Sequence, residues 1–268
     1  MTKVLLVGCG KMGSAMLAGW LDRGLAPADV VAVEPGDAAR AEFGPKGVPV
    51  VADHAAIPAA FAPDVVVLAT KPQVMPEAVP PYARYSGAVF LSIAAGRPLA
   101  FFAAALGSSA AVVRAMPNTP AAVRRGITVC AANAQVDPAR RALCQSLLEA
   151  VGEVGWVEDE GLIDAVTAVS GSGPAYVFLL AEAMAAAGTR AGLPPELATR
   201  LARATVSGAG ELLRQSTESA EQLRKNVTSP GGTTAAALAV LMAEGHGMTE
   251  LMTEAIAAAT RRSKELAG

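Results

Sequence analysis

The chain has 268 residues, enough for one large domain or two of moderate size. Hydrophobic residues make up 52% of it and charged residues 17%, so a sizeable core is available and extensive disorder is disfavoured. The formal net charge of −2 argues against nucleic acid and anionic membranes as partners. The three cysteines lack the spacing of a zinc site or a disulfide framework. We therefore expect no metal site and a reducing, cytoplasmic location.

Short apolar segments alternate with helix-like segments along the first half of the chain. Residues 4–7, Val-Leu-Leu-Val, are typical of a buried parallel strand, and residues 12–23 follow helical spacing. Further strands are predicted at residues 30–33, 64–69, 89–93 and 111–114, with edge strands at 127–131 and 156–157. This alternation predicts βαβ units in an α/β, Rossmann-like, doubly wound sheet.

The second half reads as helices rich in Ala, Leu and Met, at residues 161–169, 174–191, 195–215 and 247–266. We predict a dinucleotide-binding domain in residues 1–160 and an all-helical domain in residues 161–268. The longest charge-free run, residues 226–243, is broken by Thr-Ser-Pro-Gly-Gly-Thr-Thr, so we expect no membrane span there.

Residues 8–13, Gly-Cys-Gly-Lys-Met-Gly, form a G-x-G-x-x-G motif between a predicted strand and a predicted helix. Gly8 allows the tight turn, Gly10 lets the backbone approach a pyrophosphate, and Gly13 lets the helix pack on the strand. The free N–H groups of the helix start favour phosphate. The alternative is a glycine turn without a ligand. The cofactor-binding residues predicted here are Gly8, Gly10, Lys11, Met12 and Gly13.

Glu34 ends the second predicted strand, about 20 residues after the glycine motif. A carboxylate at this position accepts hydrogen bonds from the adenosine ribose and repels a 2′-phosphate. Glu34 therefore favours NADH over NADPH, a preference that Arg40 would weaken. The alternative is a solvated strand end.

Three loops follow strands at the carboxyl edge of the predicted sheet, where ligands of doubly wound folds gather. Lys71 would lie near the nicotinamide, although an ordinary surface lysine is an equally good interpretation. Ala95 lies in a loop small enough for a cofactor ring to approach, and flanking prolines fix the loop of Asn118. The cofactor-binding residues predicted in these loops are Thr70, Lys71, Pro72, Ala95 and Asn118.

Two polar, glycine-rich segments, residues 170–174 and 226–234, interrupt the helical half. Hydroxyl groups and free N–H groups at a helix start suit a carboxylate ligand. An ordinary helix cap explains the first segment equally well, whereas the density of Ser, Thr and Gly in the second favours a site.

The sequence offers few groups for acid–base catalysis. His54 and His246 lie outside the loops predicted to be catalytic, and no lysine occurs between Lys71 and Lys225. Ketone reduction needs an acid that protonates the developing alkoxide, whereas a protonated iminium already carries the charge that hydride cancels. The scarcity of acids favours reduction of a C=N bond over a C=O bond.

The chain resembles the pyrroline-5-carboxylate reductase family along essentially its whole length. Residues 8–13, 70–72, 116–120 and 170–176 follow the family's order, and residues 223–234, Leu-Arg-Lys-Asn-Val-Thr-Ser-Pro-Gly-Gly-Thr-Thr, are similar to its signature. The resemblance implies reduction of the cyclic imine 1-pyrroline-5-carboxylate to L-proline by NADH or NADPH, the last step of proline biosynthesis.

The resemblance also implies residue roles and partners. It implies that Ser229, Gly232 and Thr233 hold the substrate carboxylate, largely through backbone N–H groups. It implies that the Thr234 hydroxyl faces the ring nitrogen, which makes Thr234 the catalytic candidate. It further implies a homodimer exchanged through its helices, and dimers that often build larger rings. Thr233 departs from the small residue usual there, and Glu34 stands where some members bind phosphate.

Two other functions compete with this prediction. A β-hydroxyacid dehydrogenase shares the two-domain plan, but it needs a lysine on an early helix of the second domain, and residues 161–215 contain none. A non-catalytic dinucleotide sensor explains the glycine motif but not the hydroxyl-rich residues 229–234.

Overall fold

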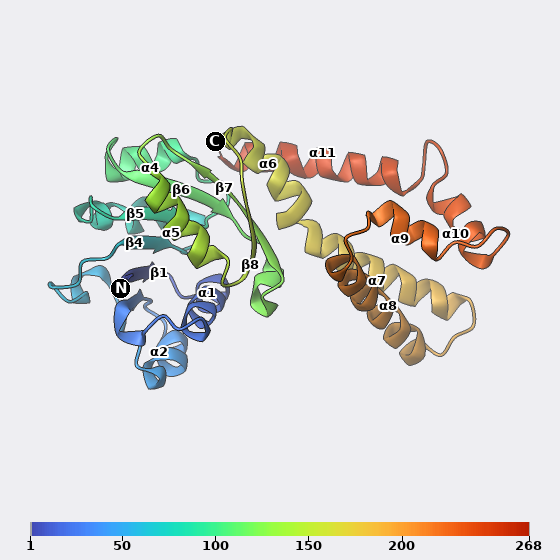
Figure 1. The fold of residues 1–268 in the computed structure, drawn as a ribbon, viewed down its shortest axis with the longest axis horizontal. Coiled ribbons are helices and arrows are strands. Elements are labelled where there is room, and N and C mark those ends of the chain that lie inside the picture. Colours follow the sequence, from blue (N-terminus) through green and yellow to red (C-terminus); the bar gives the residue numbers. More distant parts are fainter. Residues whose placement is uncertain (1, 268) are drawn as a thin grey trace. The chain divides into compact units, whose positions relative to one another are not determined.

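A computed structural model describes residues 2–267, with side chains described to Leu266. The chain forms two compact units. The first runs to Gly171 and also takes in the end of the last helix from Thr260, and the second is Ser172–Ala259 (Figure 1). The predicted domain boundary between residues 160 and 161 stays a prediction, because compact units and functional domains are different divisions of a chain.

The first unit is built on an eight-stranded sheet in the order β3-β2-β1-β4-β5-β6-β7-β8. All neighbouring strands pair in parallel except β6 and β7, which are antiparallel. This confirms the predicted α/β, doubly wound class, and the strand order reverses between β1 and β4, where such folds bind ligands. The strands are β1 Val4–Val7, β2 Val30–Val33, β3 Val50–Val51, β4 Val65–Leu68, β5 Val89–Ser92, β6 Ala111–Met116, β7 Gly126–Ala132 and β8 Gly152–Trp156.

The central strands are buried on both faces, which explains their unbroken apolar sequences. Alternate residues enter two separate cores: Val4 and Leu6 join one, and Leu5 and Val7 join the other. Helices α1, α2 and α5 cover the first core (Figure 1), and α3 and α4 cover the second. Their bounds are α1 Lys11–Asp22, α2 Asp37–Phe43, α3 Met75–Ala78, α4 Leu99–Leu106 and α5 Pro138–Leu148.

Short helical turns make most of the remaining connections. After β8 the chain passes through α6 Ile163–Val166 into a π-helical turn, Thr167–Gly171, where the first unit ends. The 3₁₀ turns are Pro27–Asp29, Gly44–Lys46, His54–Ala56, Pro72–Val74, Pro80–Arg84, Thr119–Val123 and Glu160–Leu162.

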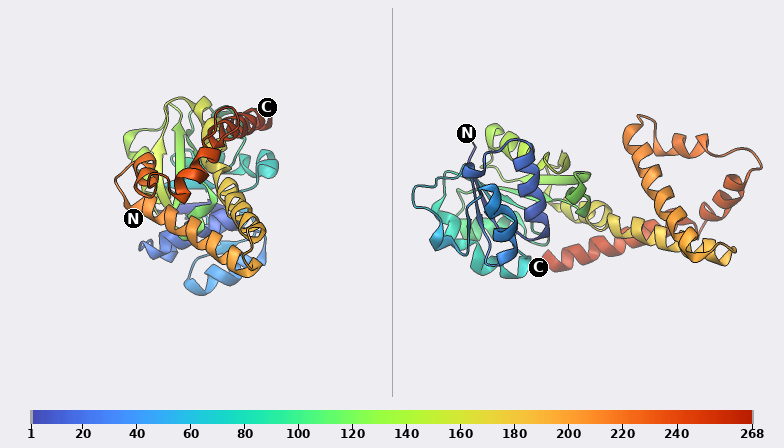
Figure 2. Two further views of the ribbon diagram at one scale, coloured as in Figure 1. Left: turned by 90° about the vertical axis from the view of Figure 1, so that its right-hand side faces the viewer. Right: turned by 90° about the horizontal axis from the view of Figure 1, so that it is seen from below.

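The second unit is helical, as the sequence predicts. Helices α7 and α8 form a hairpin in which Gly188 lies close to Ala198, because a Cβ at Gly188 would lie 3.3 Å from the Ala198 methyl group (Figure 2). The last helix, α11, returns its final turns to the first unit. The helices are α7 Gly173–Arg190, α8 Pro195–Gln215, α9 Ala220–Asn226, α10 Thr233–Leu241 and α11 Met248–Ala267.

Large apolar side chains are exposed on the helices of the second unit. Such a surface marks an interaction site in a folded protein. By length and composition alone, the helical run Glu160–Arg190 is long and apolar enough to cross a membrane. Only 11% of its most apolar 18-residue stretch is buried. The exposed residues include Val177, Phe178, Leu179, Leu180, Met184, Leu201, Leu212, Leu213, Val240, Leu241, Met242, Met248 and Leu251.

Candidate active site

The three glycines of the 8–13 loop meet different surroundings. Gly8 has φ +91°, and a Cβ there would lie 2.8 Å from the Ala69 carbonyl group. A Cβ at Gly13 would collide with the Gly8 carbonyl oxygen. By contrast, no described atom lies within 4 Å of the Cβ position at Gly10. Gly8 and Gly13 are therefore required by the packing of β1, β4 and α1, whereas Gly10 leaves open space for a ligand.

Helix α1 presents backbone donors at this open space. Gly10 is its N-cap, and among the described residues no side chain caps this helix and no acidic residue occupies its first turn. The first-turn N–H groups, including those of Lys11 and Met12, have no acceptor within an α-helix and lie at the positive end of its dipole. The start of α1 is therefore suited to an anion such as a phosphate.

A groove of about 600 Å³ adjoins the glycine loop. It brings together five of the residues predicted to bind cofactor: Gly8, Gly10, Glu34, Thr70 and Lys71. The other predicted cofactor residues, Lys11, Met12, Gly13, Pro72, Ala95 and Asn118, are not among the residues that line it.

Four further polar or aromatic residues line the groove, none of which was predicted to belong to a site; His54 was considered in the sequence analysis and set aside. They are Asp53, His54, Glu77 and Tyr82. Asp53 and His54 follow β3, whose two residues are too few to give a strand signal in the sequence. The His54 ring meets the Tyr82 ring edge-on, with the ring centroids 6.4 Å apart. Burial raises the pKa of Tyr82 to about 12, so its hydroxyl group stays protonated near neutral pH.

Glu34 holds the glycine loop in place. Its Oε2 atom accepts a hydrogen bond from the Cys9 N–H at 2.8 Å, and its Oε1 atom accepts one from the Gly36 N–H at 3.1 Å. A carboxylate has lone pairs for further donors, so the side chain keeps acceptor capacity on the groove side. Glu34 thus combines a structural role with the position predicted for ribose binding.

The Thr70 hydroxyl is a buried polar group of the groove whose hydrogen bonding the protein leaves unsatisfied. Its Oγ1 atom is buried and has no hydrogen-bond partner among the described residues. An unsatisfied buried hydroxyl is costly unless a ligand or water completes it. With the open space at Gly10 and the uncapped start of α1, it shows that the groove fits a phosphate-bearing nucleotide.

The Asn118 amide already has protein partners at both ends. Its Oδ1 atom accepts from the Ile127 N–H at 2.9 Å, and its Nδ2 atom donates to the Ser170 carbonyl at 3.2 Å. The side chain therefore ties β7 and the π-helical turn together. That Asn118 binds cofactor stays a prediction. Because its side-chain amide is already hydrogen-bonded at both ends, the backbone groups of Asn118 would make that contact.

In the second unit, the hydroxyl-rich turn leads into α10. The Thr228 hydroxyl donates to the Arg224 carbonyl at 2.6 Å, and the Gly232 N–H donates to the Ser229 carbonyl at 3.1 Å. Helix α10 starts at Thr233 with Gly232 as its N-cap, and no described side chain caps it. Its first-turn N–H groups are thus available to a carboxylate, as at α1.

The cysteines do not supply a nucleophile to these sites. Burial raises the pKa of Cys9, which belongs to the glycine loop, and raises that of Cys144 to about 12. The pKa of Cys130 is likewise raised by burial. All three thiols are therefore protonated at neutral pH. Within the part of the chain that the structure describes, no three His, Cys, Asp or Glu side chains gather as metal ligands.

Comparison with known proteins covers both parts of the chain. A family model for pyrroline-5-carboxylate reductase dimerisation matches residues 160–266, and one for NADP oxidoreductase, coenzyme F420-dependent, matches residues 3–96. The pyrroline-5-carboxylate reductase of Pseudomonas aeruginosa is 43% identical over 99% of this chain and 97% of its own length. The chain belongs to the pyrroline-5-carboxylate reductase family. The resemblance inferred from the sequence motifs is thereby confirmed.

Solved structures of pyrroline-5-carboxylate reductases share the fold. The enzyme from Coxiella burnetii has a TM-score of 0.92 and 35% identity, and the comparison covers 100% of this chain and 99% of that one. The Plasmodium falciparum enzyme, solved with NADP bound, has a TM-score of 0.82 and 26% identity over 100% of this chain and 98% of its own. Both units therefore have counterparts in reductases of this family.

The glycine loop yields a matched pair of substitutions. We expect Gly10→Val to fold normally, because its side chain enters open space, but to weaken binding of NADH or ADP-ribose at least about tenfold. Gly13→Ala should instead lower the melting temperature, because its methyl group collides with the Gly8 carbonyl. Thermal unfolding and calorimetric titration test both. Unchanged nucleotide affinity in a folded Gly10→Val protein would contradict the assignment.

Proposed function

We propose that this protein reduces 1-pyrroline-5-carboxylate to L-proline with a reduced nicotinamide dinucleotide, as the last step of proline synthesis. The observation that carries the proposal is the likeness to named pyrroline-5-carboxylate reductases over nearly the whole of both chains. Two of the helix starts that lack a side-chain cap, those of α1 and α10, would supply one anion site for the cofactor and one for the substrate.

The cofactor belongs in the groove beside the glycine loop. The α1 start and the space at Gly10 would take the pyrophosphate, and the orphaned Thr70 hydroxyl would gain a partner. Glu34 would accept from the ribose hydroxyls and repel a 2′-phosphate, so NADH is the preferred cofactor in this proposal. When bound, the cofactor supplies the hydride, and the chain's own groups fix its orientation.

The substrate belongs at the start of α10. Its carboxylate would accept hydrogen bonds from the N–H groups around Ser229, Gly232 and Thr233, near the positive end of the helix dipole. The Thr234 hydroxyl would face the ring nitrogen and orient it. Because the protonated imine already carries a positive charge, this step needs orientation rather than a strong acid.

The exposed apolar side chains of the helical unit would be buried against a partner, which in this proposal is a second copy of the chain. The family model that matches residues 160–266 describes dimerisation, and this region contains both the Glu160–Arg190 run and the exposed apolar side chains. A homodimer interface buries such surface. We therefore propose a cytoplasmic homodimer, which builds larger rings of dimers, rather than a protein anchored in a membrane or bound to nucleic acid.

A steady-state assay tests the proposed function. We expect NADH oxidation by the purified protein to depend on added 1-pyrroline-5-carboxylate and to yield proline. A β-hydroxyacid dehydrogenase would instead turn over a semialdehyde, and a nucleotide sensor would bind NADH without consuming it. Turnover with a semialdehyde, or none with either substrate, would refute the proposal.

Glu34→Gln tests the cofactor preference. Glutamine keeps an acceptor for the Cys9 N–H but removes the charge that repels a 2′-phosphate. We expect the ratio of kcat/KM for NADPH to that for NADH to rise about tenfold, equal to ~1.4 kcal/mol. Glu42→Gln, which removes the charge of an exposed carboxylate paired with Lys46, is the control and should leave the ratio unchanged. If the ratio of kcat/KM values is unchanged in Glu34→Gln, the charge of Glu34 does not determine the cofactor preference.

Thr234→Val tests the catalytic hydroxyl. Valine keeps the shape of the side chain and loses the group that orients the ring nitrogen, so kcat should fall at least about tenfold. The neighbouring Thr233→Val keeps the backbone N–H that binds the carboxylate and should retain most of the activity. Equal kcat values for the two variants would exclude a special role for Thr234.

A further inference from the structure

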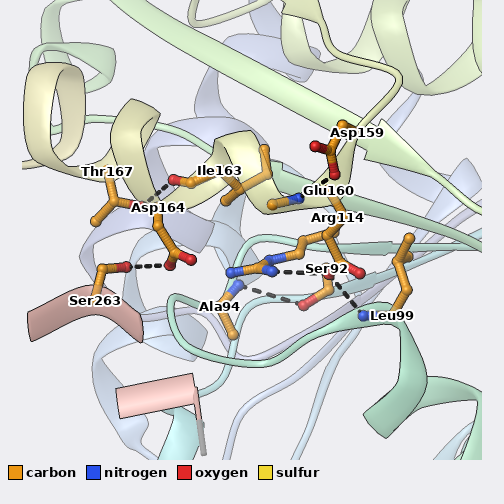
Figure 3. Close-up of polar contacts among 11 residues, drawn as sticks. Ser92, Ala94, Leu99, Arg114, Asp159, Glu160, Ile163, Asp164, Thr167 and Ser263 are labelled. Atoms are coloured by element: carbon orange, nitrogen blue, oxygen red, sulfur yellow. Dashed lines mark hydrogen bonds and ion pairs between the residues drawn. The ribbon is translucent and has the colours of Figure 1, made fainter. Parts of the chain in front are cut away.

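A polar cluster lies beside the loop that follows β5 (Figure 3). Arg114 on β6 is 5% exposed, and its Nη1 atom lies 2.7 Å from the Glu160 Oε1 atom. Ser92, at the end of β5, is fully buried, and its hydroxyl accepts from the Ala94 N–H at 3.3 Å. A charge as deeply buried as that of Arg114 is rarely left without a partner, and here the partner is the partly exposed Glu160 carboxylate.

The same Glu160 carboxylate oxygen caps a helix far away in the sequence. It accepts a hydrogen bond from the Leu99 N–H at 2.8 Å, at the first residue of α4 (Figure 3). The N-cap position of α4 is Pro98, and no side chain among the described residues caps α4 from that position. Glu160 therefore supplies an acceptor for the first N–H group of α4, one of the donors that the start of a helix leaves without a partner. One oxygen atom fixes both the buried Arg114 and the start of α4.

Residues 93–98, the loop between β5 and α4, are also held on other sides. Arg97 donates from Nε and Nη2 to the Pro72 carbonyl at 3.1 and 2.9 Å, which ties this loop to the 70–72 loop. Gly96 has φ +71°, and a Cβ there would lie 3.2 Å from the Leu266 carbonyl oxygen of α11.

The end of α11 is itself held by a hydrogen bond to Asp164, a carboxylate on α6. The Ser263 hydroxyl donates to Asp164 Oδ1 at 2.6 Å, which joins α11 to α6 (Figure 3). Ala95 is thus exposed in a loop that is tied to the 70–72 loop by Arg97 and to Glu160 through the Leu99 amide. The small residues Ala94, Ala95 and Gly96 of a loop anchored in this way suit a planar ring that must be held in one orientation.

We propose that Glu160 is a positioning residue: by capping α4 and pairing with Arg114, it holds the 93–98 loop in the shape that orients the nicotinamide ring for hydride transfer. This role rests on the proposed function for the identity of the ring. Glu160 contacts neither cofactor nor substrate in this proposal, and it acts through the Leu99 amide.

The test compares Glu160→Gln with a double variant, Arg114→Met with Glu160→Met. Loss of one charge leaves Arg114 buried without its partner, so Glu160→Gln should lower the melting temperature. The double variant removes both charges and restores apolar packing, but it cannot cap Leu99. We expect its melting temperature to recover while kcat stays about tenfold below the wild-type value. Full recovery of kcat together with the melting temperature would overturn the proposal.

Three further measurements separate positioning from general damage. Hydrogen exchange of the Leu99 amide should accelerate at least about tenfold in the double variant, whether or not the enzyme turns over, because methionine has no oxygen to accept from this N–H, whereas Glu160→Gln keeps an acceptor. Affinity for ADP-ribose, which lacks the nicotinamide, should stay within about twofold of the wild-type value. With 4-deuterated NADH, the isotope effect on kcat should rise because hydride transfer becomes more limiting. A Leu99 amide that stays protected in the double variant, or an ADP-ribose affinity that falls as far as kcat, would overturn the proposal.

Glu158→Gln is the matched control. Glu158 lies two residues earlier and pairs with Arg141 at 3.4 Å, with 89% of its side chain exposed. Its substitution should leave kcat, Leu99 exchange and ADP-ribose affinity unchanged. If the wild-type protein does not reduce 1-pyrroline-5-carboxylate, the proposed function fails, and the exchange and ADP-ribose measurements still decide whether Glu160 anchors the loop.

Discussion

The unsatisfied N–H groups at the start of a helix are the constraint on which the candidate sites depend. Two helices are capped by their own side chains: Asp137 accepts from the first turn of α5, and Ser219 from that of α9. At α1, α2 and α10 the N-cap is glycine, which brings no side-chain acceptor, and at α1 the open space beside Gly10 leaves room for an anion. Helix α4 lies between these cases, because its acceptor comes from Glu160, 61 residues away.

This choice of caps links local sequence to function. A glycine N-cap leaves the first-turn donors exposed to whatever anion approaches, and it leaves room for that anion. The open space at Gly10 contrasts with the crowding at Gly8 and Gly13, so neighbouring glycines of one motif serve different ends. Two of them serve packing, and one serves the ligand in the proposed function.

Most of the fold follows from patterns within short stretches of sequence. The buried strands are apolar on both faces and the helices keep their spacing, so both are visible in windows of a few residues. β3 was missed because its two residues give no pattern. The groove residues Asp53 and His54 were missed with it, and the Arg114–Glu160 pair joins residues 46 apart, for which no local signal exists. The second role of Glu34, holding the Cys9 N–H, likewise depends on tertiary contact.

Burial of its titratable groups restricts the acid–base chemistry that this chain can perform. The fold moves the pKa of Cys9, Cys144 and Tyr82 upwards, away from neutrality, because burial penalises their charged forms. General acid–base catalysis is most effective when the catalytic pKa lies near the working pH. A protein that buries its thiols and its groove phenol in neutral form is therefore better suited to a substrate that already carries its proton. A cyclic iminium meets that condition, and binding it at amide groups and hydroxyls requires no side chain to titrate.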